Sequence, residues 1–177
     1  AVASFWMLGS VSGPQSWIKG VEELPPGTWA ELSIKDKFLS PVSYWDIGES
    51  WLSQQRQISQ VELQDEVRQA LIESVSYHLV SDVPVGLFLS GGIDSGVLAG
   101  LVVECGMTNL NGFTICYEEF EGTQENEVPD AAVIAKHYGI KHVVRKVSKN
   151  EFYRDLPSIF EAMDQPTIDG INTWYAA

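Results

Sequence analysis

Six consecutive residues, Ser90-Gly-Gly-Ile-Asp-Ser95, combine the residue types that bind phosphate. Gly91 and Gly92 let the backbone approach a ligand closely, and Ser90 and Ser95 add hydroxyl donors. Between a strand and a helix, such a loop points successive backbone N–H groups into one concavity beside the positive end of the helix dipole. We therefore expect Ser90, Gly91, Gly92 and Ser95 to hold a phosphate group.

Asp94 is the member of this loop that does not suit a phosphate, because a carboxylate repels the anion unless a cation lies between them. Carboxylate oxygens are ligands that Mg²⁺ prefers, so we expect Asp94 to bind Mg²⁺. The alternative is a tight strand-to-helix turn in which Asp94 only caps the helix. The sequence has no Gly-x-x-x-x-Gly-Lys-Ser/Thr motif and no Gly-x-Gly-x-x-Gly after the strand, which disfavours a kinase-type P-loop and a dinucleotide fingerprint.

The elements around the loop can be assigned from the apolar pattern. Residues 85–89 are a short apolar run that predicts a buried strand, and apolar residues spaced along 97–102 predict a helix that ends at Gly106. An earlier amphipathic helix is indicated by apolar residues that recur every fourth position: Val67, Leu71, Val75 and Leu79.

The same order of elements repeats downstream of Gly106. We expect a strand over 112–117, a helix over 130–138, a strand over 142–147 and a helix over about 150–163. Alternating strands and helices of this length predict an α/β fold with a parallel sheet and helices on both faces.

The N-terminal part has a different pattern. Up to residue 46, short apolar segments alternate with turn formers, which is typical of a mostly β unit. Residues 47–60 are polar and weakly periodic, so we interpret them as a linker. We therefore expect a domain remnant over 1–46, a linker over 47–60 and a second domain over 61–177.

The charge composition of the chain disfavours some classes of binding partner. The chain has 24 acidic and 11 basic residues, and its net charge of −13 disfavours binding to nucleic acid or to an anionic membrane. The sequence contains no apolar run long enough to span a membrane. Cys105 and Cys116 lie in apolar stretches without CxxC spacing, so we expect buried structural thiols in a reducing, cytoplasmic compartment.

Other polar and aromatic groups have two interpretations each. The acidic run after residue 117 is more typical of a solvated loop than of a metal site; it comprises Glu118, Glu119, Glu121, Glu125, Glu127 and Asp130. Asp164 and Asp169 either face the phosphate loop or cap a helix, and His142 either faces a pocket or packs at a strand start. We expect the six Trp residues to serve core or interdomain packing.

Several segments resemble one known family. Residues 81–95, Ser-Asp-Val-Pro-Val-Gly-Leu-Phe-Leu-Ser-Gly-Gly-Ile-Asp-Ser, closely resemble the SDVPxGxxLSGGxDS segment of asparagine synthetases, whose SGGxDS core is shared by ATP pyrophosphatases. Residues 131–142 resemble the family's A-x-x-V-A-x-x-x-G-x-x-H pattern, with Ile134 in place of Val, and residues 163–170 resemble its D-x-P-x-x-D stretch. Residues 20–27 and Tyr44-Trp45 look like the last strands of the family's glutaminase domain.

This resemblance implies a fold and a reaction. The fold is an adenine-nucleotide α-hydrolase-like (PP-loop) domain, preceded by the end of an N-terminal-nucleophile glutaminase domain. The reaction is cytoplasmic: Mg²⁺-ATP adenylates the β-carboxylate of aspartate, and ammonia, supplied free or from glutamine, converts the β-aspartyl-AMP to asparagine. Asp94 is then the implied catalytic, Mg²⁺-binding residue, and Phe88, Leu89 and Ile115 are implied contacts of the adenosine. The resemblance leaves a homodimer open for the full-length form.

The sequence also departs from the family pattern. It contains no N-terminal Cys nucleophile, and the family's second motif, S-G-x-G-x-D-E, is expected beyond residue 177, so we expect a fragment that is inactive by itself. Phe88, Ile93 and Gly96 differ from the commonest members. The alternatives are therefore a related amidotransferase or β-lactam-synthetase-like ligase with another carboxylate acceptor, and a non-catalytic nucleotide-binding module.

Overall fold

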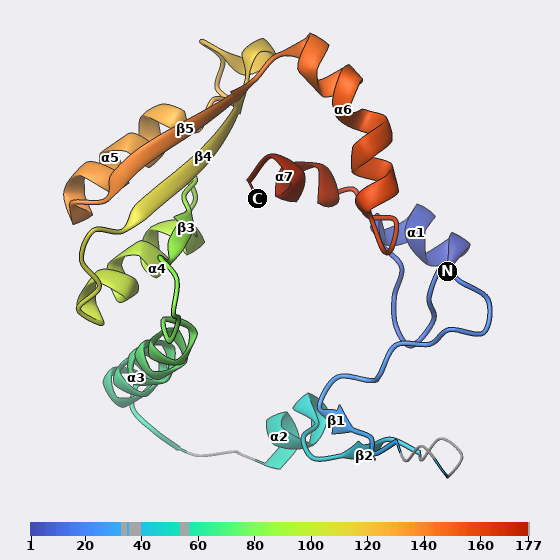
Figure 1. The fold of residues 1–177 in the computed structure, drawn as a ribbon. Helices are drawn as coiled ribbons and strands as arrows, with labels where there is room; N and C mark the ends of the chain where they lie inside the picture. Colours follow the sequence, from blue (N-terminus) through green and yellow to red (C-terminus); the bar gives the residue numbers. More distant parts are fainter. Residues whose placement is uncertain (33–34, 36–39, 54–56, 177) are drawn as a thin grey trace. The chain divides into compact units, whose positions relative to one another are not determined.

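The structure, a computed structural model, describes residues 1–32, 35, 40–53 and 57–176 (Figure 1). The chain divides into two compact units: residues 1–57 with 160–170, and residues 58–159 with 171–177. The second unit contains the Ser90–Ser95 loop and all the buried apolar residues of the described chain.

A three-stranded parallel sheet forms the centre of the second unit. Its strands are β3 (Gly86–Phe88), β4 (Asn111–Tyr117) and β5 (Lys141–Val147), in the order β3-β4-β5. Leu87 pairs with Gly112, which pairs in turn with His142. The predicted α/β fold with a parallel sheet is thereby confirmed.

The predicted helices are present with small shifts of their ends. They are α3 (Gln60–His78), α4 (Ile93–Glu104), α5 (Val128–Tyr138) and α6 (Lys149–Ala162), with a short α7 (Gly170–Ala176) and a 3₁₀ turn over Glu118–Phe120. Ser59 and Glu62 form a reciprocal capping box at the start of α3, which satisfies two backbone N–H groups there. Gly139 ends α5 at φ 68°, a left-handed conformation that glycine adopts without steric cost.

The hydrophobic core lies on one face of the sheet, where α4 and α5 cover the strands (Figure 1). Alternate residues of β4 point to this side, so Gly112, Thr114 and Cys116 are buried while the residues between them are half-buried. The core comprises Val75, Leu87, Leu89, Ala99, Leu101, Val102, Leu110, Ala131, Ala135 and Ile140.

The opposite face of the sheet is covered only in part. Tyr175 of α7 packs edge-on against Tyr117 at the end of β4, and Val147 at the end of β5 is fully buried. Phe88, the last residue of β3, is by contrast 60% exposed. The prediction that helices cover both faces is therefore confirmed for the core side. On the second face, part of the apolar surface of the strands is exposed.

The first unit has little regular β structure. Strands β1 (Thr28–Trp29) and β2 (Val42–Ser43) form a short antiparallel pair, while α1 (Val2–Leu8) and α2 (Ile47–Ser53) are helical. Helix α1 was not expected, because its β-branched and aromatic residues favour strands; a left-handed Gly9 ends it by donating its N–H to the Phe5 carbonyl.

None of the described residues of the first unit is buried. The six Trp residues of the chain are each at least 40% exposed, so the predicted packing of Trp in a core is wrong. The alternative, interdomain packing, stays a prediction. Helix α2 occupies the first half of the predicted linker, and residues 54–56 of that linker lie outside the described residues. The assignment of residues 1–46 to a glutaminase domain, and the domain boundary itself, remain predictions.

Candidate functional site

The Ser90–Ser95 segment joins the end of β3 to the start of α4, as its sequence predicts. Its two hydroxyl groups lie 2.8 Å apart and close the loop on itself. The backbone N–H of Ser90 donates to Ser95 Oγ at 3.2 Å, and the N–H of Gly92 donates to Ser90 Oγ at 3.1 Å. These short-range bonds hold the loop in one shape before any ligand binds.

The start of α4 has no side-chain cap. Its N-cap residue is Gly92, and the N–H groups of Ile93, Asp94 and Ser95 have no acceptor four residues earlier within the helix. Asp94 is exposed in the first turn, and within the described chain its carboxylate has no hydrogen bond or ion pair. The alternative in which Asp94 serves as the helix cap is therefore wrong, and the helix start presents uncapped donors with partial positive charge.

A pocket of about 480 Å³ lies beside this loop, within the second unit. Its wall includes five of the residues expected to bind the nucleotide: Phe88, Leu89, Ser90, Ser95 and Ile115. The three remaining predicted residues, Gly91, Gly92 and Asp94, are exposed and are not part of the pocket wall. The tertiary structure thus brings most of the predicted set to one cavity at the carboxyl edge of the sheet, where open α/β sheets bind ligands.

The rest of the wall comes from residues that the sequence reasoning did not assign to the site: Phe113, Thr114, Cys116, Tyr117, Phe120, Glu125, Asn126, Glu127, Asn172, Thr173 and Ala176. Helix α7 supplies the last three of them. The signal that could have found α7 is the adjacent D-x-P-x-x-D stretch over 163–170, since the next polar residues along the chain are Asn172 and Thr173.

Tyr117 connects α7 to the sheet. Its hydroxyl donates to Asn172 Oδ1 at 2.8 Å, and its ring makes edge contacts with Phe120, Phe152 and Tyr175. Burial raises the pKa of Tyr117, and the neighbouring Tyr175 raises it further. The phenol therefore remains a neutral donor at physiological pH and fixes α7 as one wall of the pocket.

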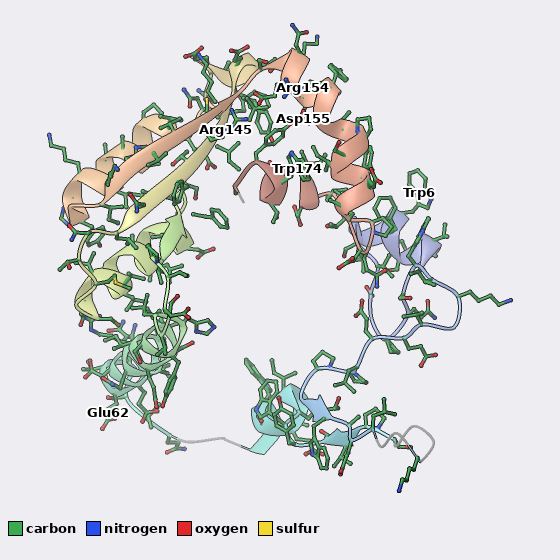
Figure 2. All side chains as sticks on the ribbon, in the orientation of Figure 1. Trp6, Glu62, Arg145, Arg154, Asp155 and Trp174 are labelled. Carbon is green, nitrogen blue, oxygen red and sulfur yellow. The ribbon has the colours of Figure 1, made fainter. Side chains whose placement is uncertain are left out.

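Arg145 supports the same wall from β5. Its guanidinium, on the side chain labelled in Figure 2, lies 5.9 Å from the centre of the Tyr175 ring. It also binds the carboxylate of Glu151. The hydrogen bond from Arg145 lowers the pKa of Glu151 below its usual value. Burial raises the pKa of Tyr175, whose hydroxyl has no hydrogen-bond partner among the described residues.

The acidic run after β4 does not form a metal cluster in the described part of the chain. Glu121 binds Lys146 at 2.7 Å, and a hydrogen bond from Thr123 lowers the pKa of Glu125. Asp130 lies against the loop, since a Cβ added to Gly91 would come within 3.0 Å of its Cβ. The solvated-loop interpretation fits these contacts better than the metal-site interpretation.

Of the remaining candidates, Cys116 is part of the pocket wall, whereas Cys105, His142 and the two aspartates lie outside it. His142 hydrogen-bonds to Thr114, which agrees with a packed side chain. Asp164 and Asp169 belong to residues 160–170 of the first unit. Cys105 and Cys116 are free thiols, and Cys116 is buried. No helix in the described part of the chain is long and apolar enough to cross a membrane.

Comparison with known proteins adds independent information. The asparagine synthase family model matches residues 66–176. A putative glutamine-hydrolysing asparagine synthetase of Mycobacterium tuberculosis H37Rv is 31% identical over 169 residues, which cover 96% of this chain and 25% of the relative. Asparagine synthetase [glutamine-hydrolyzing] 1 of Bacillus subtilis is 37% identical over 113 residues, covering 64% of this chain and 17% of that protein.

A more distant relative has a different name. Amidase chyE of Penicillium rubens is 29% identical over 127 residues, covering 64% of this chain and 19% of that protein. The chain thus spans a quarter or less of the length of these three relatives. The family model covers the whole of the loop, the sheet and α7, and with these matches it shows that the chain belongs to the asparagine synthase family.

Proposed function

We propose that this chain forms the ATP-binding part of a glutamine-dependent asparagine synthetase. The observation that carries the proposal is the pocket at the carboxyl edge of the sheet, which joins Ser90 and Ser95 to the apolar side chains of Phe88 and Ile115. A nucleotide needs both kinds of surface, because its phosphates require N–H and hydroxyl donors while its base and sugar require apolar contacts.

In this proposal the nucleotide phosphates lie at the loop. The uncapped N–H groups of Ile93, Asp94 and Ser95 donate to phosphate oxygens, and the glycines allow their close approach. Phe88, Leu89 and Ile115 contact the adenosine. The hydrogen bonds between Ser90 and Ser95 preorganise these donors, so little loop ordering is needed on binding.

Asp94 is the residue that would hold Mg²⁺. Its carboxylate suits the task because it is exposed beside the loop and has no partner in the described chain. When bound, the ion would neutralise negative charge that develops on the leaving pyrophosphate. The role of the protein side chain is to place that neutralising charge next to the helix start.

The proposed reaction has two steps, as in the family. A β-carboxylate oxygen of aspartate attacks the α-phosphorus of ATP and displaces pyrophosphate. Ammonia then attacks the acyl carbon of the β-aspartyl-AMP and displaces AMP, leaving asparagine. The donors at the start of α4 would stabilise the charge that moves onto the pyrophosphate in the first step.

The test is a product assay of the full-length gene product. The protein is incubated with Mg²⁺-ATP, glutamine or ammonia, and either aspartate or one of a panel of other carboxylic acids, and AMP, pyrophosphate and the amide are quantified. We expect asparagine and AMP in equal amounts with aspartate. Amide formation confined to another acid would contradict the assignment of aspartate.

A second candidate is a related ligase or amidase with a different acceptor. The relatives named amidases, chyE of Penicillium rubens and chry2 of Gibberella zeae, are 29% and 31% identical to the matched parts of the chain, close to the identity of the asparagine synthetases. The same panel separates the two candidates. Binding of Mg²⁺-ATP without AMP release on any acid would instead favour a non-catalytic nucleotide-binding module.

A further inference from the structure

Thr114 occupies an unusual place in the sheet. It is 3% exposed, and among the described residues it is the only buried polar side chain apart from the phenol of Tyr175. Its hydroxyl lies 2.6 Å from the carbonyl oxygen of Leu89 on one side and 2.7 Å from His142 Nε2 on the other. One buried side chain on β4 thus joins the end of β3 to the beginning of β5.

The direction of these two bonds follows from counting protons. A carbonyl oxygen can only accept, so the single hydroxyl proton of Thr114 is donated to Leu89. The hydroxyl oxygen must then accept from His142, which requires the proton of the imidazole to be on Nε2. His142 therefore orients the Thr114 hydroxyl toward Leu89.

Leu89 is the residue immediately before the phosphate loop. Its N–H donates to the Phe113 carbonyl at 2.8 Å, so β4 binds it through both its N–H and its C=O groups. The next N–H along the chain, that of Ser90, donates to Ser95 Oγ. The position of Leu89 thereby sets where the loop begins relative to the neighbouring strands.

We propose that His142 is a positioning residue of the nucleotide site, acting through Thr114 and Leu89 on the Ser90–Ser95 loop. The proposal rests on the function proposed above, in which this loop binds the phosphates of ATP. His142 is not part of the pocket wall, so its effect on the nucleotide is indirect. A misplaced Leu89 carbonyl shifts the loop donors, and shifted donors bind phosphate less tightly.

A matched pair of substitutions separates this role from simple packing. In His142→Gln the amide nitrogen can occupy the place of Nε2 and donate to Thr114, whereas in His142→Asn it falls one bond short. Both variants replace the ring with a polar amide. Thr114→Val removes the hydroxyl and tests whether His142 acts through it.

The first measurement is the affinity of the full-length gene product for Mg²⁺-ATP by calorimetry. We expect His142→Asn to bind roughly three- to tenfold more weakly than the wild type, the effect of losing one hydrogen bond, and His142→Gln to bind within about twofold of it. In the Thr114→Val background, His142→Asn should cause no further loss. Equal affinities of the Asn and Gln variants would overturn the proposal, as would additive losses in the double variant.

The second measurement is amide hydrogen exchange over residues 89–95 without nucleotide. We expect faster exchange in His142→Asn than in His142→Gln, and unchanged exchange in a segment remote from the sheet. If the wild type binds no Mg²⁺-ATP, the proposed function fails, and the exchange data still decide the role of His142. Identical exchange in the two variants would overturn that role even if ATP binds.

Discussion

The two faces of the parallel sheet differ in what covers them, although the same strands form both. Leu87 and Phe88 are neighbours on β3, yet Leu87 is 7% exposed and Phe88 is 60% exposed. Leu87 points toward α4 and α5 with the other core residues, while Phe88 lines the pocket. Alternation along a strand therefore places a stabilising residue and a candidate ligand-binding residue side by side in the sequence.

We therefore expect substitutions on the two faces to have different effects. The core face contributes the apolar burial that stabilises the unit, so changes there should alter its unfolding free energy. On the other face α7 packs against Tyr117, and a cavity lies beside the loop at the carboxyl edge of the sheet. Changes on that face should alter nucleotide binding or turnover more than stability.

The largest effect is expected for a core residue of α4. Leu101→Ala removes a side chain that is 7% exposed and should destabilise the second unit by about 2–5 kcal/mol, through lost burial and the cavity left behind. Hydrogen exchange of the protected amides of α4 and β4, in the full-length protein, gives the size of the loss. The affinity of the folded variant for Mg²⁺-ATP should remain near that of the wild type. A loss of affinity as large as the loss of stability would contradict the proposed difference between the two faces.

A substitution in the loop should reduce activity and leave stability nearly unchanged. Asp94→Asn removes a negative charge from an exposed side chain, so the melting temperature should stay within a few degrees. The rate of pyrophosphate release should fall about 10²-fold, the typical cost of removing one charge contact in a transition state. Steady-state assays over a range of Mg²⁺ concentrations measure it, and wild-type turnover at limiting Mg²⁺ would show that Asp94 has no metal-binding role.

Phe88→Ala offers a smaller effect with a matched control. Phe88 and Phe160 are exposed to nearly the same extent, 60% and 61%, but only Phe88 lines the pocket. Phe88→Ala should weaken Mg²⁺-ATP binding by about 1 kcal/mol, the order expected for losing one aromatic contact, while Phe160→Ala should not. Calorimetric titration compares the two, and similar affinities would remove Phe88 from the proposed adenosine contacts.

The smallest effect concerns pH and the wall that α7 provides. The pKa of Glu151 is lowered from 4.5 by its bond with Arg145, whose guanidinium stacks on Tyr175. Because the folded-state pKa is the lower one, this pair stabilises the fold above about pH 4.5, and the contribution disappears as the pH falls through the folded pKa.

Thermal unfolding of the wild type and of Glu151→Gln between pH 3 and 7 tests this sign. We expect the wild type to be slightly more stable than the variant at pH 7, and this difference in stability should disappear below about pH 4.5. The difference is small because solvent screens the Arg145–Glu151 pair. A difference that grows on acidification would contradict the assigned pair.

Much of the second unit follows from local patterns in the sequence. The periodicity of Val67, Leu71, Val75 and Leu79 and the apolar run before Ser90 each specify one element without reference to the rest of the chain. The Ser90–Ser95 loop is equally local, because its closing hydrogen bonds join residues at most five positions apart. Such features are encoded within single turns or strands, and a reading of the sequence can find them.

Other features depended on contacts across long sequence separations. The register of β4 and β5 places Thr114 beside His142, and the fold places Tyr117 beside Asn172. No local period specifies which strand pairs with which, because that choice depends on burying the core face of the sheet as a whole. The helical state of Val2–Leu8 also escaped the sequence reasoning, since propensity is weak over seven residues and context decides the outcome. The sequence by itself thus determined the loop and its flanking strand and helix. The tertiary structure decided the second wall of the pocket and the contact between Thr114 and His142, because those require side chains from separate strands and a distant helix to meet.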